Sequence, residues 1–375
     1  MEGFHINNSA SLNPLSYPKT TSWNSSTDCC SWDGIKCDEH TNQVIQIDLS
    51  SSQLYGTMDA NSSLFRLLHL RVLDLSDNDF NYSQIPPKIG ELSQLRYLNL
   101  SLSIFSGEIP PQVSKLSKLL SLDLSFRAIS SAKVGVFHLP NLKVLDLRYN
   151  PNLKGRLPEF QSSSLTKLAL DQTGFYGTLP ISIGNLSSLE TLSIPNCHFF
   201  GYIPSSIGNL TQLMQINLRY NKFKGDPSAS LANLIKLSHL IVGHNDFTIE
   251  TISWIDEIPT FIRNLGDLEF LMLSSNNITS LPNWLWRKES LQILIASNSS
   301  LTGKISPSIC NLKSLVHLEL SFNKLRGNVP SCLGNFSQSL ENLVLKGNKL
   351  SGLIPQTYMI GNSIKMIDLS NNNLQ

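Results

Sequence analysis

The sequence has 375 residues, a formal net charge of +1 and 15% charged residues, whereas roughly 25% is usual in soluble domains. It contains no run of five like charges, which argues against binding to nucleic acid or to an anionic membrane surface. It also contains no stretch of 18 apolar residues, so we expect no membrane-spanning segment.

Residues 1–43 show no periodic pattern. Met1 to His5 lack the basic start and the apolar run of a signal peptide. The stretch from Trp23 to Cys37 reads W-N-S-S-T-D-C-C-S-W-D-G-I-K-C and holds three of the six cysteines. We expect these residues to form a segment distinct from the periodic part that follows.

A repeat of about 24 residues runs from Val44 to Gln375 and reads L-x-x-L-x-L-x-x-N-x-L, the leucine-rich-repeat signature. Fourteen repeats begin at Val44, Leu70, Leu95, Leu119, Leu142, Leu165, Leu189, Leu213, Leu237, Leu268, Leu291, Leu315, Leu340 and Ile364. Each coil should add one short strand to a concave parallel sheet, with the leucines of neighbouring coils stacked into one core. The predicted fold is an α/β repeat solenoid, a right-handed superhelix over residues 44–375.

Two further repeat positions predict how each coil turns. The ninth position is Asn in most repeats, as in Asn78 and Asn221, and its amide can bond the backbone of its own turn and of the next coil. Most repeats continue with G-x-[I/L/V]-P, where proline ends a short extended stretch. The segment after this proline should form a 3-10 or short helical turn on the convex side.

One repeat and the end of the chain break the pattern. Leu237 and Leu268 are 31 residues apart, which gives an irregular insert near 246–267. The insert is either a loop that touches a ligand or partner, or a longer convex helix, or the remnant of a partly lost repeat. The sequence ends inside its last repeat without a C-terminal cap, which would expose core leucines, so we expect a truncated copy.

Glycosylation signals are frequent. Ten N-x-S/T sequons begin at Asn7, Asn24, Asn61, Asn81, Asn99, Asn185, Asn209, Asn277, Asn298 and Asn335. Together with the cysteine cluster, they favour a secreted and glycosylated protein. Cys310 and Cys332 occupy equivalent segments of adjacent coils, where they either form a disulfide or remain two free core thiols.

The cysteine segment, the repeat and its G-x-I-P extension together resemble plant extracellular leucine-rich-repeat receptor-like proteins. The resemblance implies that residues 1–43 are a partial, cysteine-containing N-terminal cap in which Cys30 pairs with Cys37. In that family the other member of the Cys-Cys pair bonds to a cysteine further upstream. No cysteine precedes Cys29 here, which would leave Cys29 free or mispaired.

The resemblance also implies a function. The chain would be an ectodomain that binds a peptide, protein or glycan on its concave face and signals through a partner receptor kinase at the plasma membrane, in defence or development. One alternative is a secreted inhibitor of cell-wall-degrading enzymes, like the polygalacturonase-inhibitor proteins, which carry fewer repeats. Another alternative is a non-functional truncated paralogue.

Most repeats carry Asp or Asn at position five and Ser at position seven, but coils four to nine differ at positions seven and eight, where aromatic residues and arginines occur and where we expect the ligand contacts. Such residues are enriched at interface hot spots. The candidates are Phe126, Arg148, Tyr149, Asp171, Gln172, Asn196, Arg219, Tyr220 and His244. Alternatively, Arg148 and Arg219 only balance nearby carboxylates on a solvated face. Since no hydrolase, P-loop, zinc-protease or kinase motif occurs, we expect no catalysis, no cofactor and no metal site.

Overall fold

The computed structural model describes residues 4–126, 128–132, 134–231, 233–249, 268–281, 283–334, 339–354 and 363–375. The chain forms two compact units. The N-terminal unit comprises Met1–Tyr176 with Asn185–Leu189, and the C-terminal unit comprises Gly177–Gly184 with Glu190–Gln375. Most of the predicted insert near 246–267 and the sequon at Asn335 lie outside the described residues.

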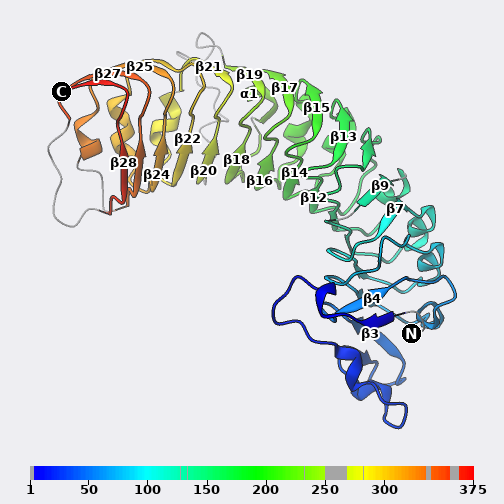
Figure 1. Cartoon of the computed structure of the whole chain (residues 1–375). Coiled ribbons are helices and arrows are strands. Elements are labelled where there is room, and N and C mark those ends of the chain that lie inside the picture. The colour runs from blue at the N-terminus through cyan, green and yellow to red at the C-terminus, as the bar shows by residue number, and fades with distance from the viewer. Residues whose placement is uncertain are drawn as a thin grey trace. The chain divides into compact units, whose positions relative to one another are not determined.

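In the N-terminal unit, successive coils contribute one strand each to a long sheet (Figure 1). In order, its strands are β2 (Ile35–Cys37), β3 (Val44–Asp48), β5 (Val72–Asp74), β6 (Tyr97–Asn99), β8 (Ser121–Asp123), β10 (Val144–Asp146) and β12 (Lys167–Ala169). β2 is antiparallel to β3, and the pairs that follow are parallel. The middle residue of each coil strand is buried, as Leu73 is, so its neighbours face outward.

The C-terminal unit repeats this arrangement. Its long parallel sheet contains β14 (Thr191–Ser193), β16 (Gln215–Asn217), β18 (His239–Ile241), β20 (Phe270–Met272), β22 (Ile293–Ile295), β24 (His317–Glu319), β26 (Asn342–Val344) and β28 (Met366–Asp368). The strands pair in register, so that Ile216, Leu240 and Leu271 are aligned across three coils. These strands confirm the predicted leucine-rich-repeat solenoid.

A second strand follows the turn of most coils. In the N-terminal unit they are β4 (Leu54–Gly56), β7 (Ser106–Ile109), β9 (Ala128–Ala132), β11 (Lys154–Gly155) and β13 (Gly174–Gly177). In the C-terminal unit they are β15 (His198–Gly201), β17 (Lys222–Gly225), β19 (Asp246–Ile249), β21 (Asn277–Ile278), β23 (Thr302–Gly303), β25 (Lys324–Gly327), β27 (Lys349–Gly352) and β29 (Asn373–Leu374).

Short turns of 3-10 helix return the chain to the sheet. They include η4 (Ser63–Arg66), η5 (Pro87–Glu91), η6 (Pro111–Lys115), η7 (Val134–His138), η8 (Ile181–Asn185), η9 (Ser205–Asn209), η11 (Asn283–Arg287), η12 (Pro307–Asn311) and η13 (Ser331–Gly334). One coil instead has a short α-helix, α1 (Ser228–Leu231). Proline lies within the first turn of η5, η6 and η12, where its missing N–H has no partner to lose.

Phenylalanine rings of neighbouring coils stack in the core of each unit. In the C-terminal unit, Phe199, Phe223 and Phe247 stack in consecutive coils with ring centroids 6.3 and 6.2 Å apart. In the N-terminal unit, Phe80 and Phe105 stack at 4.6 Å. All five side chains are fully buried, so these rings extend the leucine core beneath the turns.

The ninth-position asparagines bond the backbone as a repeated ladder. The Asn323 Nδ2 donates to the carbonyl of Leu320 at 3.0 Å and to that of Ala296 at 2.8 Å, while its Oδ1 accepts the Leu301 N–H at 2.9 Å. Asn150 and Asn348 bond in the same way. The prediction that the asparagine amide bonds the next coil was wrong, because the amide bonds the backbone of the preceding coil.

Residues before the first repeat also pack on the solenoid. The strand β1 (Phe4–Ile6) is antiparallel to β4, and the Phe4 ring meets the Phe80 ring edge-on at 5.4 Å. The remaining short turns of this segment are η1 (Asn8–Ala10), η2 (Lys19–Ser22) and η3 (Cys29–Ser31). The pairing of β1 with β4 was not predicted, because residues 1–43 show no periodic pattern.

Candidate functional site

The backbone after each sheet strand sets the direction of the candidate side chains. The eighth residue of each coil has a positive φ: Ser51, Asp77, Leu102, Phe126, Tyr149, Gln172, Asn196, Tyr220, His244, Ser275, Asn298, Phe322, Gly347 and Asn371. In most coils its N–H donates to the carbonyl of the seventh residue of the next coil, as Tyr149 does to Asp171 at 2.7 Å. The solenoid therefore imposes a left-handed conformation at a position where only one coil has glycine.

In the N-terminal unit, two predicted aromatic residues meet. The rings of Phe126 and Tyr149 stack with centroids 4.1 Å apart, and Phe126 is 43% exposed. Gln172 is exposed at the same repeat position of the following coil. The structure thus brings these candidates together as one stripe across adjacent coils.

Arg148 lies beside this stripe but is held by a carboxylate. Its Nε donates to both Asp146 oxygens at 2.8 and 3.0 Å, and Lys167 lies 3.2 Å from the same carboxylate. Hydrogen bonding to Asp146 raises the pKa of Arg148. Burial raises the pKa of the neighbouring Asp123, and the negative charge of Asp146 raises it further. Hydrogen bonds from Ser125 lower this pKa but do not cancel the rise. Arg148 therefore balances a buried carboxylate.

In the C-terminal unit, Arg219, Tyr220 and His244 form a compact cluster. The rings of Tyr220 and His244 stack with centroids 4.0 Å apart, and the Arg219 guanidinium lies 4.5 Å from the Tyr220 centroid. Arg219 Nη2 lies 3.1 Å from Tyr220 Oη and 3.3 Å from His244 Nε2. Burial lowers the pKa of His244, and the charge of Arg219 lowers it further. The exposed Asn196, one coil earlier, donates its N–H to the Arg219 carbonyl at 2.9 Å.

The sheet of the C-terminal unit carries a further surface that the sequence predictions missed. On β18, β20 and β22 the outward positions hold His239 and five apolar residues, which we call the apolar strip: Ile241, Phe270, Met272, Ile293 and Ile295. Register aligns Ile241 with Met272 and Ile295, and Phe270 with Ile293. All five are partly exposed, as is Leu240 in the middle of β18, whereas Leu271 and Leu294 in the middle of β20 and β22 are buried. The apolar third and fifth repeat positions were the signal in the sequence that could have revealed it.

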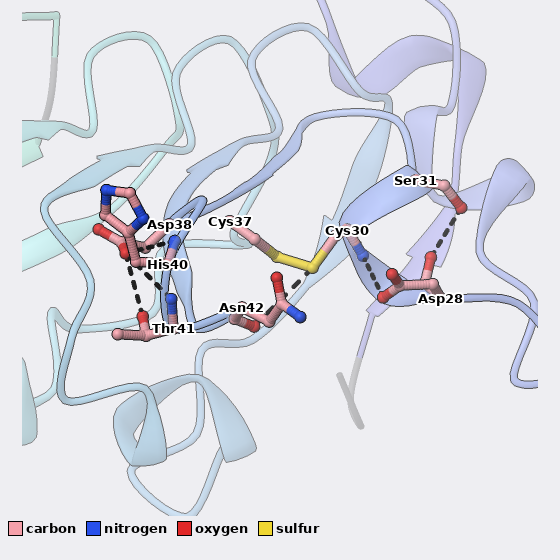
Figure 2. Close-up of a disulfide and its surroundings, with 8 residues drawn as sticks. All are labelled: Asp28, Cys30, Ser31, Cys37, Asp38, His40, Thr41 and Asn42. Carbon is pink, nitrogen blue, oxygen red and sulfur yellow. Dashed lines mark hydrogen bonds between the residues drawn. A yellow bond between two sulfur atoms is a disulfide. The ribbon is translucent and has the colours of Figure 1, made fainter.

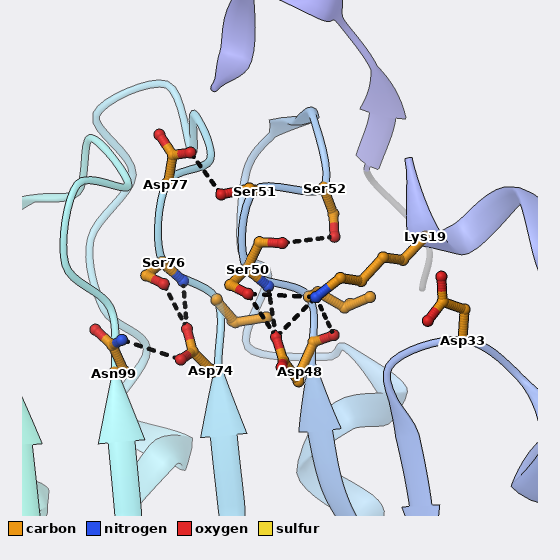
Figure 3. Close-up of polar contacts among 12 residues, drawn as sticks. Lys19, Asp33, Asp48, Ser50, Ser51, Ser52, Asp74, Ser76, Asp77 and Asn99 are labelled. Carbon is orange, nitrogen blue, oxygen red and sulfur yellow. Dashed lines mark hydrogen bonds and ion pairs between the residues drawn. The ribbon is translucent and has the colours of Figure 1, made fainter. Parts of the chain in front are cut away.

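The N-terminal segment is held to the sheet of its own unit by carboxylates (Figure 3). Lys19 Nζ lies 2.9 Å from Asp48, which also accepts from the Ser50 hydroxyl at 2.6 Å. Asp77 accepts the Leu12 N–H at 2.7 Å and the Ser51 hydroxyl at 2.7 Å. Burial alone would raise the pKa of Asp48 and of Asp77, but these hydrogen bonds outweigh it and lower both values.

The cap contains a disulfide between Cys30 and Cys37 (Figure 2). Asp28 accepts the Cys30 N–H at 3.0 Å, which orders the short turn that carries the cysteine. Cys29 is a free thiol whose sulfur lies within 4.8 Å of both disulfide sulfurs. Among the described residues this is the one cluster with metal-ligand spacing, and two of its sulfurs are bonded to each other. A second disulfide joins Cys310 of η12 to Cys332 of η13.

The described sequons differ in their surroundings. Asn24, Asn61, Asn81, Asn185, Asn209, Asn277 and Asn298 are exposed. Asn7 is half-buried and caps η1. Asn99 is half-buried in β6, where its Nδ2 donates to Asp74 at 3.0 Å and its Oδ1 accepts the Ser101 N–H at 3.0 Å. Asn99 thus lies on the outward face of the sheet with its amide already bonded.

Two family models match the chain. The leucine rich repeat N-terminal domain matches residues 8–38, and the Leucine Rich Repeat matches 69–92, 188–210, 267–287, 290–312 and 314–336. Among the described residues, no helix has the length and apolar character needed to cross a membrane.

Curated relatives include plant receptor-like proteins. Receptor-like protein 9DC1 of Solanum pimpinellifolium is 41% identical over 177 residues, which cover 46% of this chain and 20% of that protein. Receptor-like protein 6 of Arabidopsis thaliana is 33% identical over 235 residues, which cover 47% of this chain and 24% of that protein. The chain therefore matches about a quarter or less of the length of these relatives.

Solved structures of plant receptors share the fold. The plant peptide hormone receptor RGFR1, in complex with RGF2, has a TM-score of 0.79 and 31% identity, and the match covers 92% of this chain and 57% of that chain. The ectodomain of the receptor kinase GASSHO1/SCHENGEN3 from Arabidopsis thaliana, in complex with CASPARIAN STRIP INTEGRITY FACTOR 2, has a TM-score of 0.71 and 29% identity over 98% of this chain and 40% of that chain. The present chain therefore has the leucine-rich-repeat fold, and its predicted resemblance to plant receptor-like proteins is confirmed.

Proposed function

We propose that the chain is the extracellular ligand-recognition part of a plant receptor-like protein at the plasma membrane. Its sheet face binds an extracellular peptide, protein or glycan, and a partner receptor kinase carries the signal in defence or development. The role is binding, without catalysis and without a cofactor. The likeness to receptor ectodomains solved with peptide ligands supports this assignment.

The observation that carries the proposal is the exposed aromatic and arginine cluster on the sheet side of the C-terminal unit. Tyr220 is 41% exposed although it stacks on His244 and lies beneath a guanidinium. A ring that is fixed by its neighbours loses little side-chain entropy when a ligand covers it. Aromatic rings with these properties are typical interface hot spots.

The test is photo-crosslinking followed by an affinity measurement. The secreted chain carries a photoreactive amino acid in place of Tyr149 or Tyr220, or in place of Lys88 in η5 as the control position, and is exposed to extracellular plant fluid. We expect the sheet-face positions, and not the Lys88 position, to crosslink one common molecule. The crosslinked molecule is then purified, and its affinity for each variant is measured by calorimetric titration. We expect Y220A to bind it at least about tenfold more weakly than the wild type, because a hot spot contributes more than about 1.4 kcal/mol.

Two results would contradict the proposal. Equal affinity of the wild type, Y149A and Y220A for the crosslinked molecule would place binding elsewhere on the chain. A crosslinked cell-wall-degrading enzyme that the chain inhibits would replace the receptor assignment with that of a secreted inhibitor. K88A serves as the matched variant in both measurements, because its exposed side chain lies in a turn outside the sheet.

A further inference from the structure

The second strands of the C-terminal unit present two aromatic rings to solvent. β15 and β17 pair in parallel, apart from the long sheet that contains β14 and β16, and Phe200 is aligned with Lys222 (Figure 1). Phe199 and Phe223 are buried, so the residues on either side of them point outward. Phe200 is 47% exposed, and Tyr202, which directly follows β15, is 66% exposed. Two neighbouring exposed rings form an apolar patch, which is typical of an interaction surface.

The ring of Tyr202 is held in place by the next coil. A Cβ atom on Gly225 would lie 2.5 Å from two carbons of this ring, so the missing side chain of Gly225 leaves the space that the ring occupies. Gly225 has a φ of 78°, which glycine adopts without steric cost. On the same strand, Lys224 Nζ lies 5.4 Å from the centroid of the Tyr202 ring. A ring fixed in this way loses little side-chain entropy when a ligand covers it.

The two lysines beside these rings have no carboxylate partner among the described residues. Neither Lys222 nor Lys224 takes part in an ion pair there, and both are exposed. The register places Asp246 of β19 next to Lys224, yet the Lys224 ammonium lies beside the ring of Tyr202 and forms no ion pair with Asp246. Both ammonium groups therefore remain available to an external anion. We call the four side chains the aromatic-lysine patch: Phe200, Tyr202, Lys222 and Lys224.

The combination of flat rings and ammonium groups determines which ligand the patch fits. The face of an aromatic ring is electron-rich, so it attracts the C–H groups on the flat side of a pyranose sugar. An ammonium group pairs with a carboxylate on the same sugar. Protein–protein interfaces are rich in aromatic residues and arginine but poor in lysine, so the two lysines favour a sugar acid over a protein partner. Phe200 and Tyr202 are two residues apart, about 6.6 Å along an extended chain, so neighbouring sugars of one polymer can contact both rings.

We propose that the aromatic-lysine patch binds a linear acidic polysaccharide of the extracellular matrix whose sugars carry carboxylates. The pyranose rings lie on the two aromatic side chains, and the carboxylates pair with the two ammonium groups. The patch belongs to the second strand of each coil, so it differs from the sheet face that carries Tyr220. The inference goes beyond the proposed function and rests on it only for the extracellular setting. Bound in this way, the chain is held in the matrix while its sheet face stays free for another ligand.

The experiment measures the binding of oligogalacturonate, a linear chain of sugar acids, to the whole chain by calorimetric titration at low salt. The same oligomer with its carboxylates converted to methyl esters provides a neutral ligand with the same sugar backbone. We expect the wild type to bind both oligomers and to bind the acid more tightly than the ester. Added salt should reduce this preference, because ions screen the attraction between exposed charges.

Two variants separate the contribution of the ring from that of the charges. Y202A should bind both oligomers about tenfold more weakly than the wild type, since stacking on an aromatic side chain contributes about this factor. K222Q/K224Q should lose the preference for the acid and keep the affinity of the wild type for the ester. Thermal melting of each variant shows that the fold is retained.

Matched control variants remove the same groups elsewhere. K324Q/K349Q removes two exposed lysines that begin β25 and β27, as Lys222 begins β17. Y82A removes a tyrosine that is 64% exposed in the N-terminal unit. Both controls should bind the acid and the ester as the wild type does.

Several results would overturn the proposal. Equal affinity of the wild type and Y202A for the acid would exclude stacking on this ring. A preference for the acid that persists in K222Q/K224Q, or that disappears in K324Q/K349Q, would reduce the effect to the net charge of the chain. Poly-glutamate that binds the wild type more tightly than oligogalacturonate does would make the occupant an acidic protein segment.

The outcome is separable from that of the crosslinking experiment. If oligogalacturonate does not bind while Tyr149 and Tyr220 crosslink a common partner, the polysaccharide site is rejected and the proposed function stands. If the oligomer binds through the aromatic-lysine patch while no sheet-face position crosslinks a partner, the site is retained and the proposed function loses its support.

Discussion

At the residue scale, the side chains that matter most for recognition follow a strained backbone position. Gln172 has a φ of 53°, which a residue with a side chain adopts only at a cost. The leucine and asparagine positions are evident in the sequence, but the left-handed conformation at position eight is not. Glycine is the usual signal of a positive φ, and Gly347 is the single glycine at this position. In most coils the eighth residue adopts this conformation together with a hydrogen bond to the next coil, whatever its side chain is.

Replacing Gln172 tests this account of position eight. We expect Q172V to lower the free energy of unfolding by about 1–2 kcal/mol, because a β-branched side chain is disfavoured in the left-handed region. Q172G should lie within about 0.5 kcal/mol of the wild type, since relief of strain offsets the added freedom of the unfolded chain. Urea unfolding monitored by circular dichroism compares the three proteins. Equal stability of Q172V and Q172G would show that no strain is present.

Arg148 and Arg219 show where sequence reasoning about the site was incomplete. Arg148 has a carboxylate partner, Asp146, whereas Arg219 has none among the described residues, and ligand contact by either arginine stays a prediction. The sequence already contains this difference, because Asp146 precedes Arg148 by two residues, whereas Asn217 precedes Arg219 by two residues. The ring stacking of Tyr220 on His244 could not be derived in this way, because it depends on how far each eighth residue turns from its strand.

At the element scale, the repeat predicted strands and turns well, because each position recurs in an equivalent environment. The third to fifth residues form the strands, and the segment after the G-x-I-P proline forms a 3-10 helix, as in η9. Residues 4–18 carry no such repeated information. Their position depends on particular polar contacts with Asp77 and on the pairing of β1 with β4.

The N-terminal segment should detach in acid. Asp77 is buried, and its pKa is lower in the folded chain than in the unfolded chain, where it is about 3.9. Its contribution to stability is therefore complete at pH values above the unfolded pKa and is lost as pH falls through the folded pKa. We expect amide hydrogens of residues 11–16 to lose protection over this window in hydrogen-exchange mass spectrometry, after correction for the pH dependence of chemical exchange.

Asp77→Asn provides the control for the acid-induced detachment. Asn tolerates the left-handed conformation at this position but cannot carry the charge that accepts the Ser11, Leu12 and Ser51 donors. The same amide hydrogens should therefore be weakly protected in D77N at neutral pH, with little further change on acidification. Protection of residues 11–16 that is equal in both proteins and constant down to pH 3 would contradict the role of Asp77.

At the scale of the whole molecule, the outward residues of the sheet strands differ in chemistry between the two units. In the first five coils of the N-terminal unit the fifth repeat position is polar, and its residues bond serines, lysine or arginine within the chain: Asp48, Asp74, Asn99, Asp123 and Asp146. In the C-terminal unit the same position becomes apolar on β18, β20 and β22. Polar groups that already bond one another gain little from a ligand, so the C-terminal unit offers the stronger recognition surface.

Glycosylation provides a test of which faces remain free for binding. A sugar on Asn99 would lie on the outward face of its sheet and would break the bond from its amide to Asp74, whereas Asn81 is exposed outside the sheet strands. We expect the chain, secreted from plant cells behind a signal peptide, to carry a glycan at Asn81 and none at Asn99. Glycopeptide mass spectrometry measures the occupancy of both sites. The mass of the secreted protein should fall by the mass of one glycan in N81Q and by none in N99Q. A sugar on Asn99 would show that this part of the sheet is covered, and would confine ligand recognition to faces without a sequon.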